Sequence, residues 1–536
     1  MKSKLIEAIK KTLEDLDITY NNEIEISEPK DKENGQFSTN IAMKLASVLK
    51  ENPLNIANKI KDNLSCENIS KIEVKAPGFI NFFVDEDYLF NMINEIIKLG
   101  NDYGRSDIGN GQSYNIEFVS ANPTGILHLG NARGGAYGDS LARILDFAGY
   151  DVVKEYYIND AGSQIDNLGL SIQARYFGLC GKEEIMPENG YHGPEILEMA
   201  KEIYNNHQEA WLNEPLDSFK DVGVKKLLSR IVNDLEEYGI KYDVFTSEKD
   251  IYQKYSLKDI VDNMNKNGYT YEQDGAIWFK STSFYDSKDH VLIRNDGNYT
   301  YLVPDIANHI NKYQRGFTKM IDVLGTDHHG YVARLKGALK ANGYDDSKLD
   351  VKLLQLVRLM NGEEIVKMSK RTGNTITLKD LIDEVGVNAA RYFFTMHSLD
   401  TQMDFDMELA KKNSSENPVY YVSYAYARIC TILNSQNNEV NVTSYNNIKD
   451  QDTLDLLAVV HKFPQVVVSA AKKELPHLIT NYVYELANNF HAYYSRHRLI
   501  TEDENKTAEN MNLIKAVKIT IKNALNLIGV EPPEKM

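Results

Sequence analysis

Residues 114–158 contain the pattern that most constrains the fold of this chain. A short apolar run at 114–120 is followed by a turn at 122–125, a long helical pattern at 128–147 and a second apolar run at 152–158. A strand, a helix and a strand in this order form a right-handed crossover, which places the two strands in parallel in one sheet. We therefore predict an α/β domain built on a parallel sheet.

The beginning of the chain has a different pattern. Helical stripes at 4–16 and 39–50, the second capped by Ser38, precede two short strands at 72–75 and 80–84. A Pro-Gly pair separates these strands and favours a tight turn between them. This part is predicted to form a small α+β domain.

Other regions depart from the alternation of strands and helices. Residues 177–273 are charged and mainly helical, which is typical of an insertion, and no role for them follows from the sequence. The alternation resumes at 275–280, and a helical stretch is expected at 353–360, before a polar turn. After residue 405 all patterns are helical, up to a last helix at 512–528. We therefore predict that the chain ends in an all-helical domain.

Composition restricts the class of protein. Hydrophobic residues make up 42% of the chain, as in ordinary globular proteins, and the three cysteines are too widely spaced for a disulfide framework or a structural zinc site. The charged start is unlike a signal peptide, and no run reaches the about 18 apolar residues that span a bilayer. We expect a soluble, cytoplasmic protein with no metal site of its own and no membrane partner.

The net charge of −17 argues against a nucleic-acid partner, because phosphate contacts need a basic surface. Acidic and basic residues almost balance after residue 405, however. The helical end can therefore still present a basic face to a nucleic acid.

The turn after the first strand has features of a nucleotide site. Gly125 and Gly130 lack side chains, so a nucleotide can approach the backbone, and His128 and Asn131 supply neutral donors near the first helical turn. Ligands of open α/β sheets bind where parallel strands end, which is where this turn is expected. The segment is neither a dinucleotide-binding glycine pattern nor a Walker A loop.

A second motif lies far along the chain, at residues 367–373. Lys367, Lys370 and Arg371 make it a cationic loop. Such a loop can neutralise the charge that develops on a leaving pyrophosphate. The two motifs together are more informative than either one alone.

As a pair, they resemble the signature elements of class I aminoacyl-tRNA synthetases. The first reads HLGN, with Asn131 where the family's HIGH motif ends in histidine, and the second reads KMSKR, with Arg371 in place of the last serine of KMSKS. The whole chain is similar to arginyl-tRNA synthetases of the bacterial type. This similarity includes a QFSTNIA segment that begins at Gln36 and an NPVYYVSYAYAR segment that begins at Asn417.

The resemblance implies a fold and an activity. It implies an N-terminal additional domain at 1–108 that contacts the tRNA elbow, a Rossmann-like catalytic domain at 109–405 with the insertion at 177–273, and a helical anticodon-binding domain at 406–536. The activity would be ATP-dependent conversion of L-arginine to arginyl-adenylate, followed by transfer to the terminal adenosine of tRNA-Arg. Family members usually need bound tRNA for the first step, and we expect a monomer.

The resemblance also implies the residues of the active site. A guanidinium needs carboxylates and neutral acceptors, so Glu117 and Asp305 are expected to bind or orient this group of arginine. Catalysis is expected from His128, Asn131, Lys367 and Lys370, with Mg²⁺ assisting. The expected arginine site comprises Glu117, Ser120, Asn122, His128, Tyr301, Asp305 and His328. The expected ATP site comprises Pro123, Thr124, Gly125, His128, Gly130, Asn131, Asp327, Lys367, Met368, Ser369 and Lys370.

The helical end supplies the expected tRNA contacts. Unstacked bases are recognised by stacking on aromatic or arginine planes, although some of the tyrosines concerned can belong to the core. The expected tRNA-binding residues are Tyr420, Tyr424, Arg428, Tyr494, Arg498 and Met536.

Three other functions were weighed against this one. A cysteinyl enzyme of the same class needs zinc-binding cysteines, and none lies near the HLGN motif. A tRNA-binding relative without catalysis would not need Asn122, His128, Lys367 and Lys370. An unrelated nucleotidyltransferase would not explain the aromatic and basic clusters of the helical end.

Overall fold

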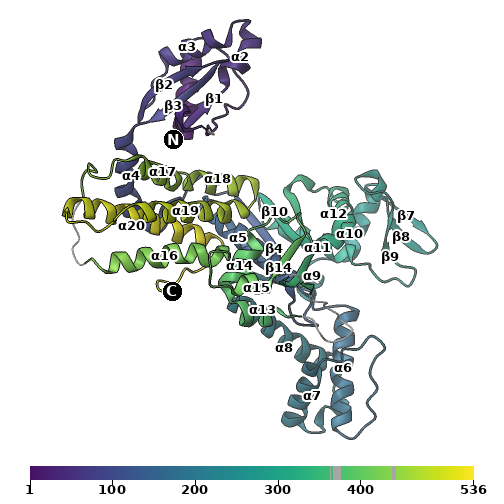
Figure 1. The fold of residues 1–536 in the computed structure, drawn as a ribbon. Helices are drawn as coiled ribbons and strands as arrows, with labels where there is room; N and C mark the ends of the chain where they lie inside the picture. The colour runs from purple at the N-terminus through teal and green to yellow at the C-terminus, as the bar shows by residue number, and fades with distance from the viewer. Residues whose placement is uncertain (30, 363, 366–375, 437–441) are drawn as a thin grey trace.

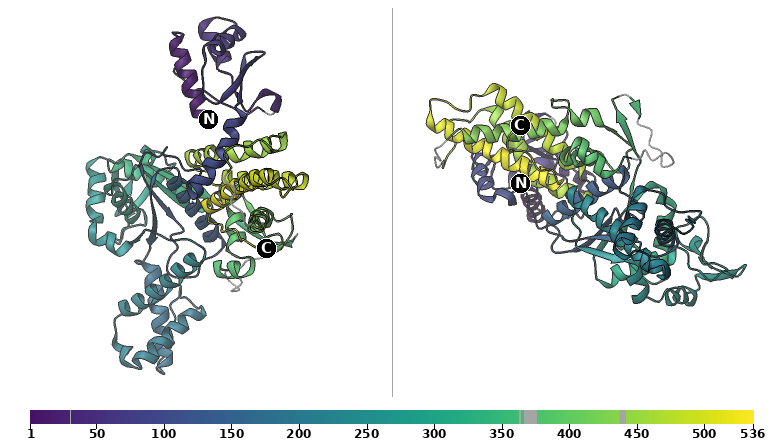
Figure 2. Two further views of the ribbon diagram at one scale, coloured as in Figure 1. Left: turned by 90° about the vertical axis from the view of Figure 1, so that its left-hand side faces the viewer. Right: turned by 90° about the horizontal axis from the view of Figure 1, so that it is seen from below.

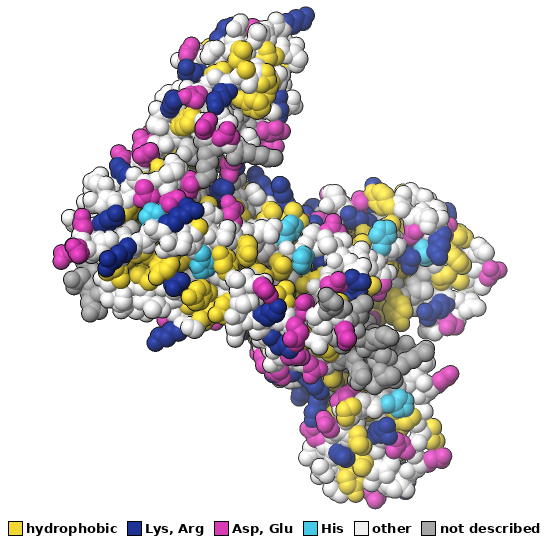
Figure 3. All heavy atoms as spheres, viewed as in Figure 1, with side chains coloured by type: hydrophobic (Ala, Val, Ile, Leu, Met, Phe, Trp, Pro, Cys, Tyr) yellow, Lys and Arg dark blue, Asp and Glu magenta, His cyan; other side chains and the backbone are white. Residues whose placement is uncertain are grey.

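The chain folds into a central parallel sheet with further lobes around it (Figures 1 and 2). The computed structural model describes residues 1–29, 31–362, 364–365, 376–436 and 442–536 of the 536-residue chain. The N-terminal lobe rises above the body of the molecule, and the C-terminal helices lie beneath it (Figure 1). Acidic and basic side chains are mixed over most of the face shown in Figure 3.

The N-terminal lobe has an apolar core of its own, to which Leu5, Leu45 and Phe82 contribute. Its three strands form an antiparallel sheet in the order β1-β3-β2, which confirms the two predicted strands and their turn. The elements are α1 (Lys2–Asp15), η1 (Lys32–Asn34), β1 (Phe37–Thr39), α2 (Ile41–Leu49), α3 (Pro53–Asn63), β2 (Ile69–Lys75) and β3 (Phe79–Val84).

The expectation that Ser38 caps the second helix is wrong. Ser38 lies in β1, where its hydroxyl donates to Asn81 Oδ1 on β3 at 2.7 Å. Asn40 precedes α2 instead. The hydroxyl satisfies the buried amide of the neighbouring strand, and this pairing is long-range, so local capping rules could not find it.

Five parallel strands form the central sheet, in the order β11-β10-β4-β5-β6. This confirms the predicted parallel sheet. Helix α5 (Leu129–Phe147) connects β4 to β5 and packs so closely on β4 that a Cβ at Gly138 would lie 2.3 Å from the Phe118 ring. The strands are β4 (Ser113–Phe118), β5 (Asp151–Ile158), β6 (Val244–Ser247), β10 (Lys319–Gly325) and β11 (Leu349–Leu354).

A helical lobe follows β5 and has its own core, which includes Ile172, Met199 and Phe219. The segment predicted as an insertion, 177–273, contains much of this lobe but also contains β6, which pairs in parallel with β5. A strand of four residues behind a charged helix gives too short a pattern to read from the sequence. The helices are α6 (Ser163–Leu179), α7 (Pro194–His207), η3 (Ala210–Asn213) and α8 (Leu216–Glu237).

A region that combines helices with short strands lies to the right of the central sheet in Figure 1. Its strands β7, β8 and β9 form an antiparallel sheet. The elements here are α9 (Glu248–Lys254), α10 (Leu257–Lys266), β7 (Thr270–Gln273), β8 (Ala276–Phe279), η4 (Ser281–Ser283), β9 (His290–Ile293), α11 (Leu302–Gln314), η5 (Thr326–His328), α12 (His329–Ala341) and η6 (Asp346–Lys348).

The helix expected at 353–360 is not formed. β11 ends at Leu354, and two residues separate it from β12 (Val357–Asn361). β12 pairs in parallel with β14 (Met403–Asp406) and antiparallel with β13 (Glu364–Ile365). The mainly apolar segment, interrupted by Gln355 and Arg358, fits a strand as well as a helix, and the distant partner β14 decides between them.

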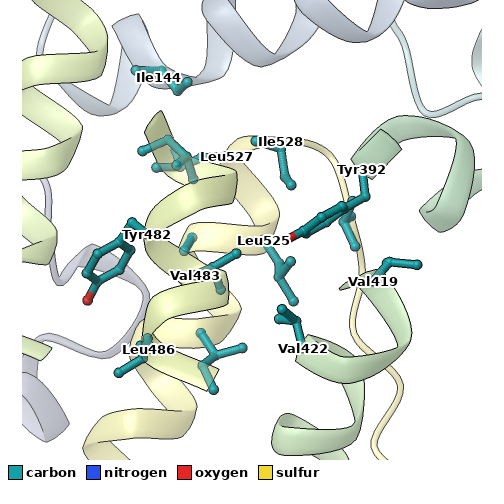
Figure 4. Close-up of a cluster of buried hydrophobic side chains, with 14 of the residues drawn as sticks. Ile144, Tyr392, Val419, Val422, Tyr482, Val483, Leu486, Leu525, Leu527 and Ile528 are labelled. Carbon is teal, nitrogen blue, oxygen red and sulfur yellow. The ribbon is translucent and has the colours of Figure 1, made fainter. Parts of the chain in front are cut away.

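Every regular element that the structure describes after β14 is a helix, as predicted. These helices share one core with α5 and α14, in which Ile144, Tyr392, Val483 and Leu525 lie close together (Figure 4). The helices of this region and its connections are α4 (Glu86–Leu99), η2 (Gly100–Asp102), α13 (Leu378–Val385), α14 (Val387–Thr395), α15 (Met407–Lys411), α16 (Pro418–Asn434), α17 (Gln451–His461), α18 (Phe463–Lys473), α19 (His477–Arg496) and α20 (Glu504–Leu527).

One stretch of the described chain, Gln451–Lys473, is long and apolar enough by length and composition to cross a membrane. It is divided into two helices, α17 and α18. Its residues Leu457, Val460, Phe463 and Val467 are completely buried in the shared core. Packing inside the protein therefore accounts for the apolar character of this stretch.

A buried ion pair joins α5 to α14. Arg391 Nη2 lies 2.7 Å from Asp139 Oδ2, and neither side chain is exposed. Arg391 also donates to the carbonyl of Ile528 at 2.9 Å and to that of Tyr238 at 3.2 Å. The guanidinium thus connects α5, the end of α8 in the helical lobe and the end of the last helix, α20.

Replacing Arg391 with methionine should lower the free energy of unfolding by about 1–3 kcal/mol, because the buried carbonyls of Ile528 and Tyr238 lose their donor. Asp139 keeps Arg143 and Lys154 as partners. The midpoint of urea denaturation, followed by circular dichroism, measures this. Arg358→Met is the control, since the Arg358–Asp404 pair is exposed and should contribute little. Equal shifts in both variants would contradict the prediction.

Candidate active site

The turn that follows β4 is held in an unusual conformation. Val119 and Ser120 have φ angles of 67° and 36°, a region that residues with side chains rarely occupy. The Tyr242 hydroxyl donates to the Phe118 carbonyl at 3.0 Å, and the Tyr156 hydroxyl donates to the Ala121 carbonyl at 2.7 Å. These bonds fix the backbone from which the predicted residues 120–125 project.

His128 and Asn131 begin α5 as a capping box. His128 Nδ1 accepts a bond from the Gly130 N–H at 3.1 Å, and Asn131 Oδ1 accepts one from the His128 N–H at 3.0 Å. A neutral His128 ring therefore has its proton on Nε2. His128 and Asn131 thus bring an imidazole and an amide group to a helix N-terminus, and both types of group can donate to phosphate oxygens.

The chain returns to this turn just after the second motif. The Leu378 N–H donates to the Leu127 carbonyl at 2.8 Å, and Thr377 forms an isolated bridge with His128. Thr377 also caps α13. The predicted residues Lys367, Met368, Ser369, Lys370 and Arg371 lie outside the described residues. The positions that follow them in sequence are next to the HLGN turn.

Glu117 is buried beneath the turn and already has a cationic partner. Lys312 Nζ on α11 lies 2.6 Å from Glu117 Oε2 and 2.9 Å from Asp322 Oδ1 on β10. Burial raises the pKa of Glu117, whereas Lys312 and His309 hold the pKa of Asp322 well below its usual range despite burial. This contact differs from the role that the resemblance implies, in which Glu117 binds the guanidinium of arginine.

Asp305 and Glu248 form a second acidic group close to the first. Asp305 lies in the first turn of α11 and accepts a bond from the Tyr331 hydroxyl. Glu248 begins α9, is 7% exposed and accepts a bond from the Tyr252 hydroxyl. Burial raises the pKa of both carboxyl groups, and the charge of Asp305 raises the pKa of Glu248 further. Within the described parts of the chain, no lysine or arginine forms an ion pair with either one.

Sequence reasoning missed Glu248. A signal exists, because Glu248 directly follows β6 at the carboxyl edge of the parallel sheet, where ligands bind. That signal depends on recognising β6 as a strand of this sheet. The strand is short and lies within the segment predicted as an insertion, so the sequence pattern does not point to this position.

The remaining predicted residues of the α/β domain lie in the connections that follow β4 and β10 or, for Tyr301, directly before α11. Asn122 Nδ2 donates to Gln164 Oε1 at 2.8 Å, and Ser120 Oγ accepts a bond from the Tyr157 N–H at 3.0 Å. Tyr301 precedes α11 and is 68% exposed. Pro123, Thr124 and Gly125 belong to the turn before α5, and Asp327 and His328 form η5 after β10.

Aromatic and basic side chains form a separate cluster on α16 and α19. The rings of Tyr420 and Tyr424 stack at 6.1 Å, and Arg428 lies over Tyr424 at 5.3 Å and over Tyr494 at 4.4 Å. His491 stacks on Tyr424 at 5.9 Å. Figure 3 shows a band of hydrophobic-class side chains with lysine or arginine beside it over these helices. Arg498 and Met536 are exposed and lie outside both helices.

Comparisons with known proteins agree along the whole chain. Three family models match: the arginyl-tRNA synthetase N-terminal domain at 3–84, the catalytic domain of class I (R) tRNA synthetases at 92–401, and the DALR anticodon-binding domain at 422–536. Arginine–tRNA ligase 1 of Halalkalibacterium halodurans is 47% identical over 526 residues, covering 96% of this chain and 94% of that protein.

Further relatives point to the same family. The arginine–tRNA ligase of Bacillus subtilis is 47% identical over 520 residues, covering 95% of this chain and 93% of that protein. The structure of Thermus thermophilus arginyl-tRNA synthetase has the same fold, with a TM-score of 0.78 at 20% identity and full coverage of both chains. With its parallel sheet, its HLGN turn and matches to all three domains, the chain belongs to the arginyl-tRNA synthetase family of class I aminoacyl-tRNA synthetases.

Proposed function

We propose that this chain activates L-arginine with ATP, releases pyrophosphate, and transfers the arginyl group from arginyl-adenylate to the terminal adenosine of tRNA-Arg, releasing AMP. The observation that carries the choice of amino acid is the pair of carboxylates formed by Glu248, which is buried, and Asp305, which is partly buried. Their charge is not balanced by a lysine or arginine in the described residues. A guanidinium, which is always charged and carries five donors, is the group that suits two such acceptors.

In this proposal the arginine side chain extends from the turn after β4 toward α9 and α11. Asp305 and Glu248 bind the guanidinium, and the exposed Tyr301 ring closes over the substrate. Ser120, Asn122, His128 and His328 lie toward the α-amino and carboxylate end. Glu117 supports the site from below rather than binding the guanidinium directly, because its ion pair with Lys312 fixes α11 against the sheet. A binding carboxylate on α11 is thereby held in place.

The chemistry of the first step needs positioning and charge stabilisation rather than a covalent enzyme intermediate. The arginine carboxylate attacks the α-phosphorus of ATP in line, and the bond to the pyrophosphate oxygen breaks. His128 Nε2–H and the Asn131 amide donate to phosphate oxygens, while Lys367 and Lys370 neutralise the leaving pyrophosphate. Further ATP contacts are assigned to Pro123, Thr124, Gly125, Gly130, Asp327, Met368 and Ser369.

Magnesium enters this scheme as part of the ATP complex. Among the residues that the structure describes, no three His, Cys, Asp or Glu side chains are grouped so that they could hold a metal ion. Mg²⁺ is usually held by substrate phosphates and water with few protein ligands. The ion would therefore arrive with ATP and share the charge of the pyrophosphate.

The tRNA is proposed to span the molecule. Residues 1–108 would contact its elbow, residues 109–405 would receive its terminal adenosine, and residues 406–536 would bind the anticodon. Tyr420, Tyr424, Arg428 and Tyr494 offer stacked planes for unpaired bases, with Arg498 and Met536 at the margin. We further propose that the protein acts as a monomer in the cytoplasm.

The activity is tested by the exchange of labelled pyrophosphate into ATP with each of the standard amino acids, with and without tRNA-Arg. Exchange should occur with arginine, because its planar guanidinium can donate to both carboxylates at once whereas the ammonium of lysine lacks this geometry, and it should require the tRNA. Exchange with a different amino acid would contradict the assignment of the pocket. Absence of exchange with all of them would contradict the proposed activity.

Glu248→Gln and Asp305→Asn should each weaken arginine binding by about 2–5 kcal/mol, because truncating one partner of a buried charge pair costs this much. Calorimetric titration with arginine measures the change, and the KM for ATP should stay the same. Glu272→Gln is the matched control, since Glu272 is exposed on β7.

The pH dependence gives a second readout for the same pair. A carboxyl group with a raised pKa takes up its proton at a higher pH than an ordinary carboxyl group does, and only the ionised form attracts the guanidinium. The dissociation constant of arginine should therefore rise as the pH falls below neutrality. In Glu248→Gln this rise should be smaller, and an unchanged profile would contradict the assignment of Glu248.

Tyr424→Ala and Arg428→Ala should weaken tRNA binding by about 1–3 kcal/mol each, the usual contribution of one stacked base, without changing arginine binding. Filter binding of tRNA-Arg at several salt concentrations measures this. Tyr426→Phe, a buried tyrosine on the same helix, is the control. If all three variants bound tRNA like the wild type, the anticodon site would have to lie elsewhere.

A further inference from the structure

Arg133 on α5 is fully buried and donates only to backbone carbonyls. Its Nη1 lies 2.9 Å from the Gln355 oxygen, and its Nη2 lies 2.8 Å from the Ser398 oxygen and 2.9 Å from the Thr401 oxygen. In the described part of the chain no carboxylate forms an ion pair with it. Burial lowers the pKa of Arg133 to about 10, so the side chain remains charged at neutral pH.

The carbonyls come from two connections that meet at one pair of strands. Gln355 lies between β11 and β12, and residues 398–401 lie between α14 and β14. The two connections also bond to each other, through the Gln355 N–H and the Leu399 carbonyl at 3.0 Å. β12 and β14 then pair in parallel. The guanidinium therefore fixes the beginning of the β12–β14 strand pair to α5.

The strand pair leads directly to the KMSKR segment. β13 pairs with β12 and ends at Ile365, two residues before Lys367 in sequence. On the other side of the segment, Leu378 is bonded to Leu127. The downstream side of the motif is thus joined to the HLGN turn directly, and the upstream side is joined to the same helix through Arg133.

We propose that Arg133 is a positioning residue for the activation step: it fixes β12 and β13 relative to α5, so that the lysines of KMSKR and the donors at His128 act on one triphosphate. This rests on the proposed function. A guanidinium suits the task because its planar fork bonds several carbonyls at once, which an ammonium cannot do with the same geometry. Arg133 itself touches no substrate in this assignment.

The experiment compares Arg133→Lys and Arg133→Met with the wild type in three measurements. These are single-turnover formation of arginyl-adenylate with tRNA-Arg present, transfer to tRNA from preformed arginyl-adenylate, and the dissociation constants of arginine and tRNA. Adenylate formation should fall by about 100-fold, since a misplacement of about 1 Å in a catalytic group has this effect. Transfer should stay unchanged, because pyrophosphate has already left. Both dissociation constants should stay unchanged, because Arg133 touches no substrate in this assignment.

Two further variants calibrate the result. Lys370→Ala should reproduce the same split between activation and transfer, because it removes a group that Arg133 is proposed to position. Arg143→Lys is the matched control: Arg143 is also on α5 and donates to the Gly239 carbonyl at 3.1 Å, but it bonds nothing in the β12–β14 region. Its adenylate formation should equal that of the wild type.

Two results would overturn the proposal. One is normal adenylate formation in both Arg133 variants. The other is a joint loss of adenylate formation, transfer, arginine binding and tRNA binding in both variants, including failure to fold, because Arg133 would then support the whole domain. A wild-type chain that forms no adenylate with any amino acid would instead contradict the proposed function.

Discussion

The contact between α5 and the central sheet is the constraint on which the rest of the structure depends. Gly138 faces the Phe118 ring at a distance that leaves no room for a side chain. The helix begins directly after its cap His128, in the connection that follows β4, and its middle residue Asp139 forms an ion pair with Arg391. The C-terminal helices share a core with α5, in which Ile144 lies near Leu527 and Ile528 (Figure 4). One helix thus carries both the HLGN turn and the contact between the sheet and the C-terminal helices.

Carboxylates beneath the turn have a cationic partner, whereas the carboxylates at its edge do not. Below it, Lys312 lies within hydrogen-bond distance of both Glu117 and Asp322, and His309 lies 2.7 Å from Asp322. At the edge, Asp305 and Glu248 are bonded only to neutral donors. Removing two carboxylates from water without a cationic partner disfavours their charged forms, which is why the pKa of both groups is raised. A cationic substrate would offset this cost when it binds. The unpaired carboxylates of the empty site would therefore favour the guanidinium of arginine.

Much of this arrangement could be predicted from local patterns. The strand–helix–strand segment, the N-terminal strands and the helical end all have sequence periods that identify them, and HLGN lies where a parallel strand ends. Three features depended on distant partners instead: Ser38 pairs with Asn81, β12 pairs with β14, and β6 pairs with β5. The roles of Arg133 and Glu248 depend on those partners too. The proposed roles of these two side chains can be inferred only after the positions of β12, β14 and β6 are known.

The N-terminal lobe has a core that shares no buried residue with the core around α5. The lobe touches the C-terminal helices through an ion pair between Lys462 Nζ and Glu28 Oε2 at 3.3 Å. Its core contributes no residue to the group around Asp305 and Glu248. If the lobe contacts tRNA as proposed, its surface can vary with the shape of that tRNA without changing the residues assigned to activation.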